Sequence, residues 1–256
     1  MPAPTTKFLA GCALLAICMT PPAGADERLA QTIARIKPAI VGIGTYAEVR
    51  RPPAAFLGTG FVIGDGRHVA TNHHVIEVEL DAAHQEHLVA FIGHGREVQY
   101  RTARITAIDQ QHDLAVLTID GAALPALAID ATAEIREGTS IAFTGFPLGA
   151  VLGLHPVTHQ GIVSALTPLA IPASTAAQLS TDKIAALRAP YNVIQLDATA
   201  YPSNSGSPVY DQSTGKVIGI VNQVFVKGKK EDVLRDPSAL TYAIPAVYLQ
   251  TLLDRQ

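Results

Sequence analysis

The chain has 256 residues, a formal net charge of −3 and a hydrophobic content of 48%. This length suits one large all-β domain or two small ones, and the hydrophobic content suits a packed globular core. The near-neutral charge excludes the strongly basic composition of many nucleic-acid-binding proteins, since the densest basic run, Lys227–Lys230, is followed at once by Glu231 and Asp232.

The first 25 residues have the pattern of a signal peptide. Lys7 supplies a positive charge, Phe8–Met19 form an apolar stretch too short to span a bilayer, and Ala23–Ala25 resemble a cleavage site of small residues. We therefore expect a mature chain that begins near Asp26, is exported to the periplasm or the cell exterior, and is not held in a membrane. An uncleaved membrane anchor is the alternative interpretation.

Both cysteines, Cys12 and Cys18, lie inside this leader, so the mature chain is expected to contain no disulfide. Residues Leu9–Cys12 also match a lipoprotein cleavage box. Only Phe8 and Leu9 of the apolar run precede that box, which makes lipidation the less favoured interpretation. An exported domain without cysteines must be stabilised by its core alone.

The mature chain begins with a predicted helix and continues as short strands. Residues 26–37 carry apolar side chains at helical spacing, and Pro38 ends the helix. The segments that follow are rich in β-branched residues and bounded by Gly, Pro, Asp or Asn. The predicted strands are 39–46, 60–63, 88–92, 103–109, 114–119, 140–145, 161–166, 193–196, 209–210, 217–222 and 240–244, and further helices are predicted at 175–188 and 246–253.

About a dozen short strands in one exported chain predict an all-β protein built as paired β-barrels or a sandwich. The least strand-like central stretch is Pro125–Glu137, and we place a boundary there, between a first half at 26–130 and a second half at 131–256. Residues 169–188 are predicted to form either an inserted helix beside the site or a solvent-facing excursion. Residues 227–238 are predicted to form a charged loop.

Catalysis by a serine nucleophile needs a hydroxyl, an imidazole that takes its proton, a carboxylate that orients the imidazole, and N–H groups that face the developing oxyanion. The chain offers candidates in the order His, Asp, Ser, within the segments VATNHHVI, DQQHDLAVLTI and YPSNSGSPVY. Taken alone, each pattern is more typical of an ordinary turn or of a surface histidine than of a catalytic residue.

Together these segments resemble the trypsin-like peptidases, especially the bacterial HtrA/Deg group. TNHHV resembles the family's T-N-x-H-V segment, which identifies His74 rather than His73 as the general base. DLAVL resembles the segment of the orienting aspartate, which falls on Asp113 rather than Asp109. SNSGSP resembles G-N-S-G-G-P and identifies Ser205 as the nucleophile. The framework segments GTGFVI, GFPLG, GIVSAL, GKVIGIVN and YAIP follow in the family's order.

The resemblance implies two six-stranded antiparallel β-barrels with the active site in the cleft between them, and short helices at both ends. His74 and Asp113 would come from the first barrel and Ser205 from the second. It also implies a serine endopeptidase that acts on proteins or peptides by acyl transfer, without cofactor or metal. HtrA relatives usually carry a PDZ domain after the protease domain, and none is expected here. The oligomeric state stays open.

Two residues depart from the family pattern. Ser203 stands where the family has its oxyanion-hole glycine, and Ser207 replaces the second glycine after the nucleophile. The resemblance implies oxyanion donors among the N–H groups of Ser203, Asn204 and Ser205. Serine still supplies an N–H donor, but it lacks the freedom of glycine at positive φ. Two alternatives therefore stay open: the Ser203 N–H is in place, or it points away until substrate binds. Ser207 contributes no donor and matters less.

The resemblance also suggests which residues select the substrate side chain. The position that commonly forms the base of the specificity pocket is Thr199, and the walls would come from Val221, Asn222, Gln223 and Val224. With no carboxylate at the base, cleavage after Lys or Arg is not expected. A small or medium uncharged side chain is predicted instead.

Three other interpretations of the sequence are a zinc site, a binding module and a dormant protease. His84, His87 and His94 have a spacing that fits no closed zinc site, and cysteine ligands are absent from the mature chain. A trypsin-like fold kept as a binding module with weak or absent hydrolysis is the main rival from another functional class, and Ser203 is the residue that favours it. A dormant protease that needs an activating partner is the third.

Overall fold

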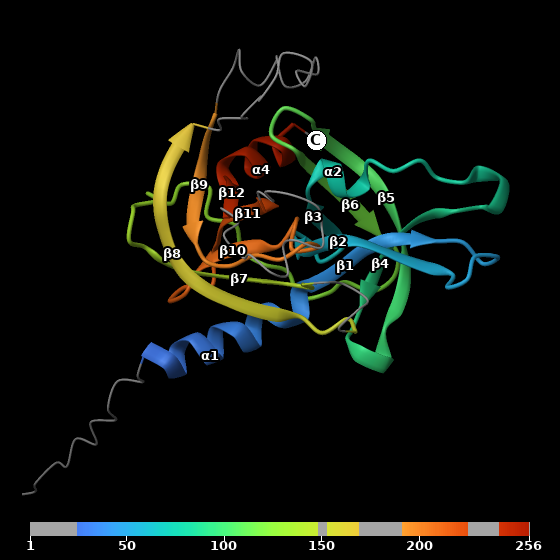
Figure 1. The fold of residues 1–256 in the computed structure, drawn as a ribbon, viewed down its shortest axis with the longest axis horizontal. Helices are drawn as coiled ribbons and strands as arrows, with labels where there is room; N and C mark the ends of the chain where they lie inside the picture. The colour runs from blue at the N-terminus through green and yellow to red at the C-terminus, as the bar shows by residue number, and fades with distance from the viewer. Residues whose placement is uncertain (1–24, 148–152, 169–190, 225–240, 256) are drawn as a thin grey trace, which may run out of the picture.

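The computed structural model describes residues 25–147, 153–168, 191–224 and 241–255. Their strands form two closed six-stranded antiparallel barrels, which stand side by side in Figure 1. This confirms the predicted all-β architecture of paired barrels. No helix among the described residues is long and apolar enough to cross a membrane.

The first barrel contains the N-terminal strands and three short helical turns. Its strands close in the order β1-β2-β3-β6-β5-β4. The strand β3 is missing from the predicted set. The bounds are β1 (Ile40–Tyr46), β2 (Ala54–Ile63), β3 (His68–Thr71), α2 (His73–Ile76), η2 (Ala82–His84), β4 (His87–Ile92), η3 (Gly95–Glu97), β5 (Gln99–Asp109) and β6 (Leu114–Ile119).

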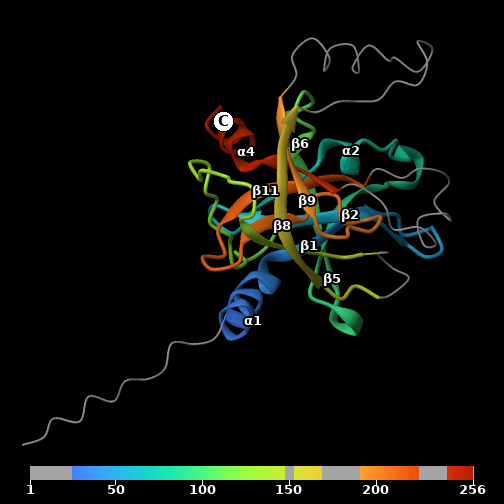
Figure 2. The ribbon, with the colours of Figure 1, turned by 60° about the vertical axis from the view of Figure 1, so that its left-hand side comes forward.

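The second barrel closes in the order β10-β11-β12-β9-β8-β7. Figure 2 shows its long strand β8 running across the front of the molecule. The bounds are β7 (Ser140–Gly145), β8 (Val157–Pro168), β9 (Asn192–Asp197), β10 (Pro208–Asp211), β11 (Val217–Val224) and β12 (Thr241–Pro245). The predicted helix at 175–188 and the predicted loop at 227–238 lie outside the described residues.

Helices lie at both ends of the described chain, as predicted. The N-terminal helix α1 (Ala25–Ile36) leads through η1 (Lys37–Ala39) into β1, and α4 (Ala246–Leu253) follows β12 directly. The ring of Tyr248 on α4 stacks on the ring of His112 from the β5–β6 turn, with centroids 4.0 Å apart and planes at 15°. The C-terminal helix therefore connects the second barrel to the first.

The segment between the barrels, residues 120–139, is joined to both of them. Isolated parallel bridges pair Ile63 with Leu127 and Ile129 with Val217. Leu127 and Val217 belong to one buried hydrophobic cluster that includes residues of both barrels. This shared core fixes the barrels against each other and so fixes the position of any site formed between them.

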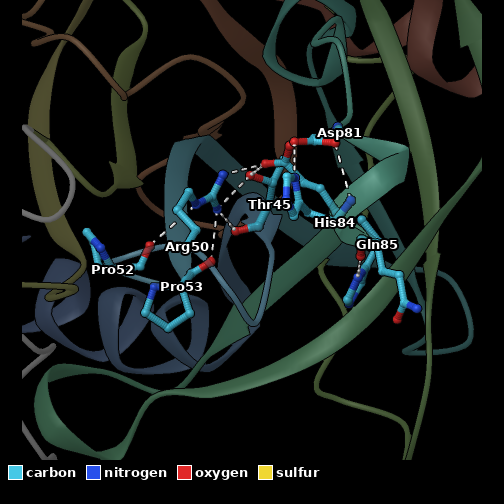
Figure 3. A network of polar contacts seen from close by, with 9 residues as sticks. Thr45, Arg50, Pro52, Pro53, Asp81, His84 and Gln85 are labelled. Carbon is cyan, nitrogen blue, oxygen red and sulfur yellow. Dashed lines mark hydrogen bonds and ion pairs between the residues drawn. The ribbon is translucent and has the colours of Figure 1, made fainter.

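A polar network ties the β1–β2 hairpin of the first barrel to the segment before β4 (Figure 3). Its centre is the carboxylate of Glu86, whose side chain is only 11% exposed. Glu86 pairs with Arg50 and accepts hydrogen bonds from the Thr45 hydroxyl at 2.6 Å and from the Asp81 N–H at 3.0 Å. These contacts, led by the Thr45 hydroxyl, hold the pKa of Glu86 below its ordinary value.

We predict that Glu86→Gln lowers the thermal stability of the protein at pH 7 by several degrees. The lowered pKa means that the carboxylate contributes fully above its ordinary pKa of 4.5 and loses this contribution as the pH falls through the lowered folded-state value. The difference in melting temperature between wild type and variant should therefore shrink in acid. Thermal unfolding followed by circular dichroism across pH measures it.

The exposed pair of Arg104 and Asp120 provides a matched control, since its side chains are 63% and 51% exposed. An exposed ion pair is screened by water, so Asp120→Asn should change the stability much less. Equal effects of the two substitutions, or a Glu86→Gln deficit that does not vary with pH, would contradict the role given to Glu86.

Candidate active site

The antiparallel pairing of β3 with β6 brings His74 and Asp113 together. Thr71, the last residue of β3, lies opposite Ala115 near the start of β6. The residues that follow β3 and those that precede β6 therefore meet at the same end of the first barrel. The histidine lies in the short helix α2, and the aspartate is the last residue before β6.

Two hydrogen bonds join His74 to the carboxylate of Asp113. The Nδ1 atom of His74 lies 2.6 Å from Asp113 Oδ2, and the His74 backbone N–H donates to Asp113 Oδ1 at 2.8 Å. The neighbouring His73 contributes its backbone N–H, which donates to the Asp113 carbonyl at 3.2 Å. The carboxylate thus fixes the orientation of the His74 ring, whose side chain remains 41% exposed.

The backbone of Asp113 has a φ of 51°, an unusual value for a residue other than glycine. Its carbonyl accepts from the Asn72 side-chain amide at 3.0 Å as well as from His73. Its own N–H donates to the Gln110 carbonyl at 3.3 Å. Strained backbone of this kind persists where the surrounding structure holds it, and here these contacts direct the carboxylate toward α2.

The second aspartate of the segment, Asp109, has a histidine of its own. His112 places Nδ1 2.7 Å from Asp109 Oδ2 and donates its backbone N–H to Oδ1 at 3.1 Å. The rings of Tyr191 and Tyr248 cover this pair. Burial, together with the nearby charge of Asp113, raises the pKa of Tyr191. This second pair was not predicted, although the D-x-x-H spacing in one turn was a visible signal.

Ser205 lies in a tight turn that leads into β10. The Asn204 N–H donates to the Tyr201 carbonyl at 3.1 Å, and the Ser207 N–H donates to the Asn204 carbonyl at 2.9 Å. Gly206 has a φ of 86°, and a Cβ atom there would lie 2.0 Å from the Thr59 carbonyl oxygen. Only glycine fits this position, because the turn presses against strand β2.

Strand β2 is where the two halves of the site meet. The Thr59 N–H donates to the Ser205 carbonyl at 2.9 Å across the contact between the barrels. A Cβ atom on the preceding Gly58 would lie 2.9 Å from the Val75 side chain and 3.3 Å from the Ser205 carbonyl oxygen. The helix that carries His74 and the turn that carries Ser205 therefore flank the same point of β2.

The hydroxyl of Ser205 is hydrogen-bonded to a backbone carbonyl rather than to the histidine in this structure. It donates to the backbone carbonyl of Asn222 at 2.9 Å, and no hydrogen bond joins it to His74 among the described residues. A nucleophilic serine must give its proton to the imidazole, so the side chain must rotate away from Asn222 before it reacts.

Ser203 has a backbone conformation that is unusual for a serine. It has a φ of 78°, so the serine keeps the left-handed conformation that a glycine would adopt. The physical reason is that its carbonyl accepts a hydrogen bond from the Thr59 hydroxyl at 2.9 Å. The N–H groups of Ser203 and Ser205 donate to no described residue, whereas the N–H of Asn204 is already bound to Tyr201.

The residues expected to select substrate are spread over different environments. Thr199 is exposed. Val221 is fully buried in the hydrophobic core of the second barrel, so its side chain packs inward, and Asn222 is 8% exposed. The side chains of Gln223 and Val224 lie outside the described part of the structure. Contacts of Thr199 and Asn222 with a substrate stay a prediction.

Ser207, the second departure from the family pattern, is fully buried two residues after Ser205. A Cβ atom on Gly145 would lie 2.0 Å from the Ser207 hydroxyl oxygen, so the serine fits because position 145 carries no side chain. The Ser207 hydroxyl and the Asn204 side-chain amide are buried and have no hydrogen-bond partner among the residues that the structure describes.

The histidines considered for zinc have other neighbours. His84 Nδ1 lies 2.6 Å from Asp81, His87 Nδ1 lies 3.0 Å from the Gln85 carbonyl, and the His94 ring stacks on that of His155. Within the described ranges, no group of three or more His, Cys, Asp or Glu residues is placed to hold a metal ion.

The arrangement of an Asp-oriented histidine and a serine turn between two β-barrels agrees with comparisons to known proteins. A family model described as a trypsin-like peptidase domain matches residues 58–220. The chain belongs to the trypsin-like peptidase family. Relatives named "Probable periplasmic serine endoprotease DegP-like" come from Halomonas elongata, 31% identical over 186 residues, and Chlamydia trachomatis serovar D, 30% identical over 216 residues.

The matches to these two trypsin-like relatives cover 73% and 84% of this chain but 32% and 37% of theirs, so the chain spans about a third of their length. Solved structures share the fold over 88% of the chain. The HtrA-type protease AlgW with a decapeptide has a TM-score of 0.63 at 22% identity and is covered over 67% of its length. Deg5 has a TM-score of 0.60 at 25% identity and is covered over 92%. These matches confirm the HtrA-like resemblance.

Proposed function

We propose that this protein is a serine endopeptidase that hydrolyses peptide bonds through an acyl-enzyme on Ser205. The observation that carries the proposal is the bidentate His74–Asp113 pair, held at the same point of β2 as the Ser205 turn. The names of the relatives, periplasmic serine endoproteases, support this activity and an exported location in the periplasm or outside the cell.

The first half of the reaction forms the acyl-enzyme. The Ser205 hydroxyl turns from the Asn222 carbonyl toward His74 and gives its proton to Nε2 as Oγ attacks the peptide carbonyl carbon. Asp113 accepts a hydrogen bond from the Nδ1–H group of His74 and stabilises the imidazolium that forms. His74 then gives the proton to the leaving amine, and the C–N bond breaks.

The second half releases the acyl group. Water attacks the ester carbonyl while His74 removes its proton, and the proton returns to Ser205 as the C–O bond to the enzyme breaks. In both halves the negative charge on the carbonyl oxygen needs donors that are in place beforehand. We assign these donors to the N–H groups of Ser203 and Ser205, since that of Asn204 is bound to Tyr201.

The proposed substrate is an extended segment of a protein or peptide. Solved AlgW structures contain a decapeptide or a tripeptide, which supports peptide binding by this fold. Thr199 offers no carboxylate at the expected base of the specificity pocket, so cleavage after a small or medium uncharged side chain is proposed. Cleavage after Lys or Arg would count against this assignment.

A dormant protease is the second candidate, and the hydrogen bond from Ser205 to Asn222 favours it. In that case the serine stays turned away from His74 until a ligand or partner shifts the population of its rotamers. A binding module without hydrolysis would keep the turn but would not use the serine hydroxyl.

We predict that a rhodamine-linked fluorophosphonate labels the wild-type protein stoichiometrically on Ser205. Labelling should be abolished in Ser205→Ala and in His74→Ala, because the probe needs both the nucleophile and its base. Ser213→Ala, at an exposed turn, should label like the wild type. Gel fluorescence and intact mass measure the extent.

The labelling experiment also separates the candidates. Slow labelling that an added peptide accelerates would indicate the dormant protease. No labelling of correctly folded protein, with or without peptide, would contradict the endopeptidase proposal and favour a binding module.

The two aspartates should respond differently to the same substitution. Asp113→Asn should lower the labelling rate about 10³- to 10⁴-fold, since an amide no longer holds the His74 tautomer required for catalysis. Asp109→Asn disturbs the partner of His112 and should lower the melting temperature with a much smaller effect on the rate. The reverse order of the two rates would show that Asp109 is the orienting carboxylate.

A further inference from the structure

Thr59 is fully buried on β2 and uses all its polar atoms at the contact between the barrels. Its N–H donates to the Ser205 carbonyl at 2.9 Å, and its hydroxyl donates to the Ser203 carbonyl at 2.9 Å. The hydroxyl oxygen accepts the Phe146 N–H at 3.1 Å, and the Thr59 carbonyl accepts the Thr71 hydroxyl at 2.7 Å. One residue of the first barrel thus binds two carbonyls of the turn that carries Ser205, residues 201–207, which we call the nucleophile turn.

These contacts fix alternate peptide planes of the turn. The Ser203–Asn204 peptide is bound at both ends, since its carbonyl accepts from Thr59 and its N–H donates to Tyr201. The Ser205–Gly206 peptide is also bound at both ends, through Thr59 and through the Val221 carbonyl. The Pro202–Ser203 and Asn204–Ser205 peptides, each directly before one of these bound peptides, carry the N–H groups of Ser203 and Ser205, which donate to no described residue.

The conformation of Ser203 makes the hydroxyl of Thr59 important. Left-handed backbone is unfavourable for a residue with a Cβ atom and is readily adopted by glycine. Ser203 nevertheless has a φ of 78°. The Phe146 N–H occupies one lone pair of the Thr59 hydroxyl and leaves its proton directed at the Ser203 carbonyl. This bond opposes rotation of the Ser203–Asn204 peptide out of the left-handed arrangement.

We propose that Thr59 is a positioning residue that holds the oxyanion-binding conformation of the nucleophile turn, and that its hydroxyl offsets the presence of serine at position 203. This inference rests on the proposed endopeptidase function. Thr59 touches no reacting atom. It acts by fixing the Ser203–Asn204 and Ser205–Gly206 peptides, which directly follow the two N–H donors, so its loss should slow acylation.

The test compares Thr59→Val, which keeps the shape and the N–H but removes the hydroxyl, with Thr59→Ser, which keeps the hydroxyl. The readout is the second-order rate of labelling by the rhodamine-linked fluorophosphonate. A misaligned oxyanion donor should slow Thr59→Val by about 10- to 100-fold. Thr59→Ser should stay within about threefold of the wild type, because the hydroxyl restores the donor that positions Ser203.

Thr45→Val is the matched control. Thr45 is another buried threonine of the first barrel, and its hydroxyl donates to Glu86, away from the nucleophile turn. Its loss should lower the melting temperature without slowing the labelling. If Thr59→Val does not fold, Thr59→Cys replaces it, since a thiol donates weakly. That variant should then label more slowly than Thr59→Ser.

A double variant tests the link to Ser203. Glycine at 203 adopts the left-handed conformation without the penalty, so Ser203→Gly should raise the labelling rate of Thr59→Val by a larger factor than it changes that of the wild type. The inference would be overturned if Thr59→Val were labelled at the wild-type rate, or if Thr45→Val were slowed equally. It would also be overturned if Thr59→Ser were as slow as Thr59→Val, or if the effects of Thr59→Val and Ser203→Gly were strictly additive. An unlabelled wild type would instead overturn the endopeptidase function.

Discussion

The site depends on the close contact between strand β2 and the nucleophile turn. The Thr59 N–H and hydroxyl bind two carbonyls of that turn, and Gly206 leaves room for the Thr59 carbonyl, which a Cβ atom would approach to 2.0 Å. Because β2 also packs against α2 through Gly58 and Val75, this contact sets the position of the His74 pair relative to Ser205. The contacts of Thr59 with the nucleophile turn therefore join parts of both closed barrels into one site.

The sequence predicted much of the fold, because strands and turns leave local signals, and the proposed triad residues also lie in local motifs. Strands β6 and β7 were predicted at their observed bounds from short segments that contain β-branched residues and are bounded by turn residues, and His74, Asp113 and Ser205 each lie in a short motif. The role of Thr59 had no such signal, since its hydroxyl meets a carbonyl 144 positions away in the chain. For the same reason the sequence did not indicate that Ser203 would keep the left-handed conformation of a glycine.

The proposed catalytic groups lie close to the same point of β2, but one of them is not yet in the arrangement that the reaction needs. The histidine is oriented and the turn is fixed, yet the Ser205 hydroxyl is bound to the Asn222 carbonyl. In the proposed mechanism, activation then requires rotation of the Ser205 side chain rather than rearrangement of the turn. A constitutive protease and a dormant protease differ in whether a substrate or a partner supplies the free energy for this rotation.

The most direct test of the account is a crystal structure of the protein with a peptide boronate. The account predicts a covalent bond from boron to Ser205 Oγ, with the hydroxyl withdrawn from Asn222. One boronate oxygen should lie within hydrogen-bond distance of both the Ser203 and Ser205 N–H groups, with Ser203 still left-handed. A Ser205 hydroxyl that stays on Asn222 without a bond to boron, or a boronate oxygen directed away from these N–H groups, would contradict it.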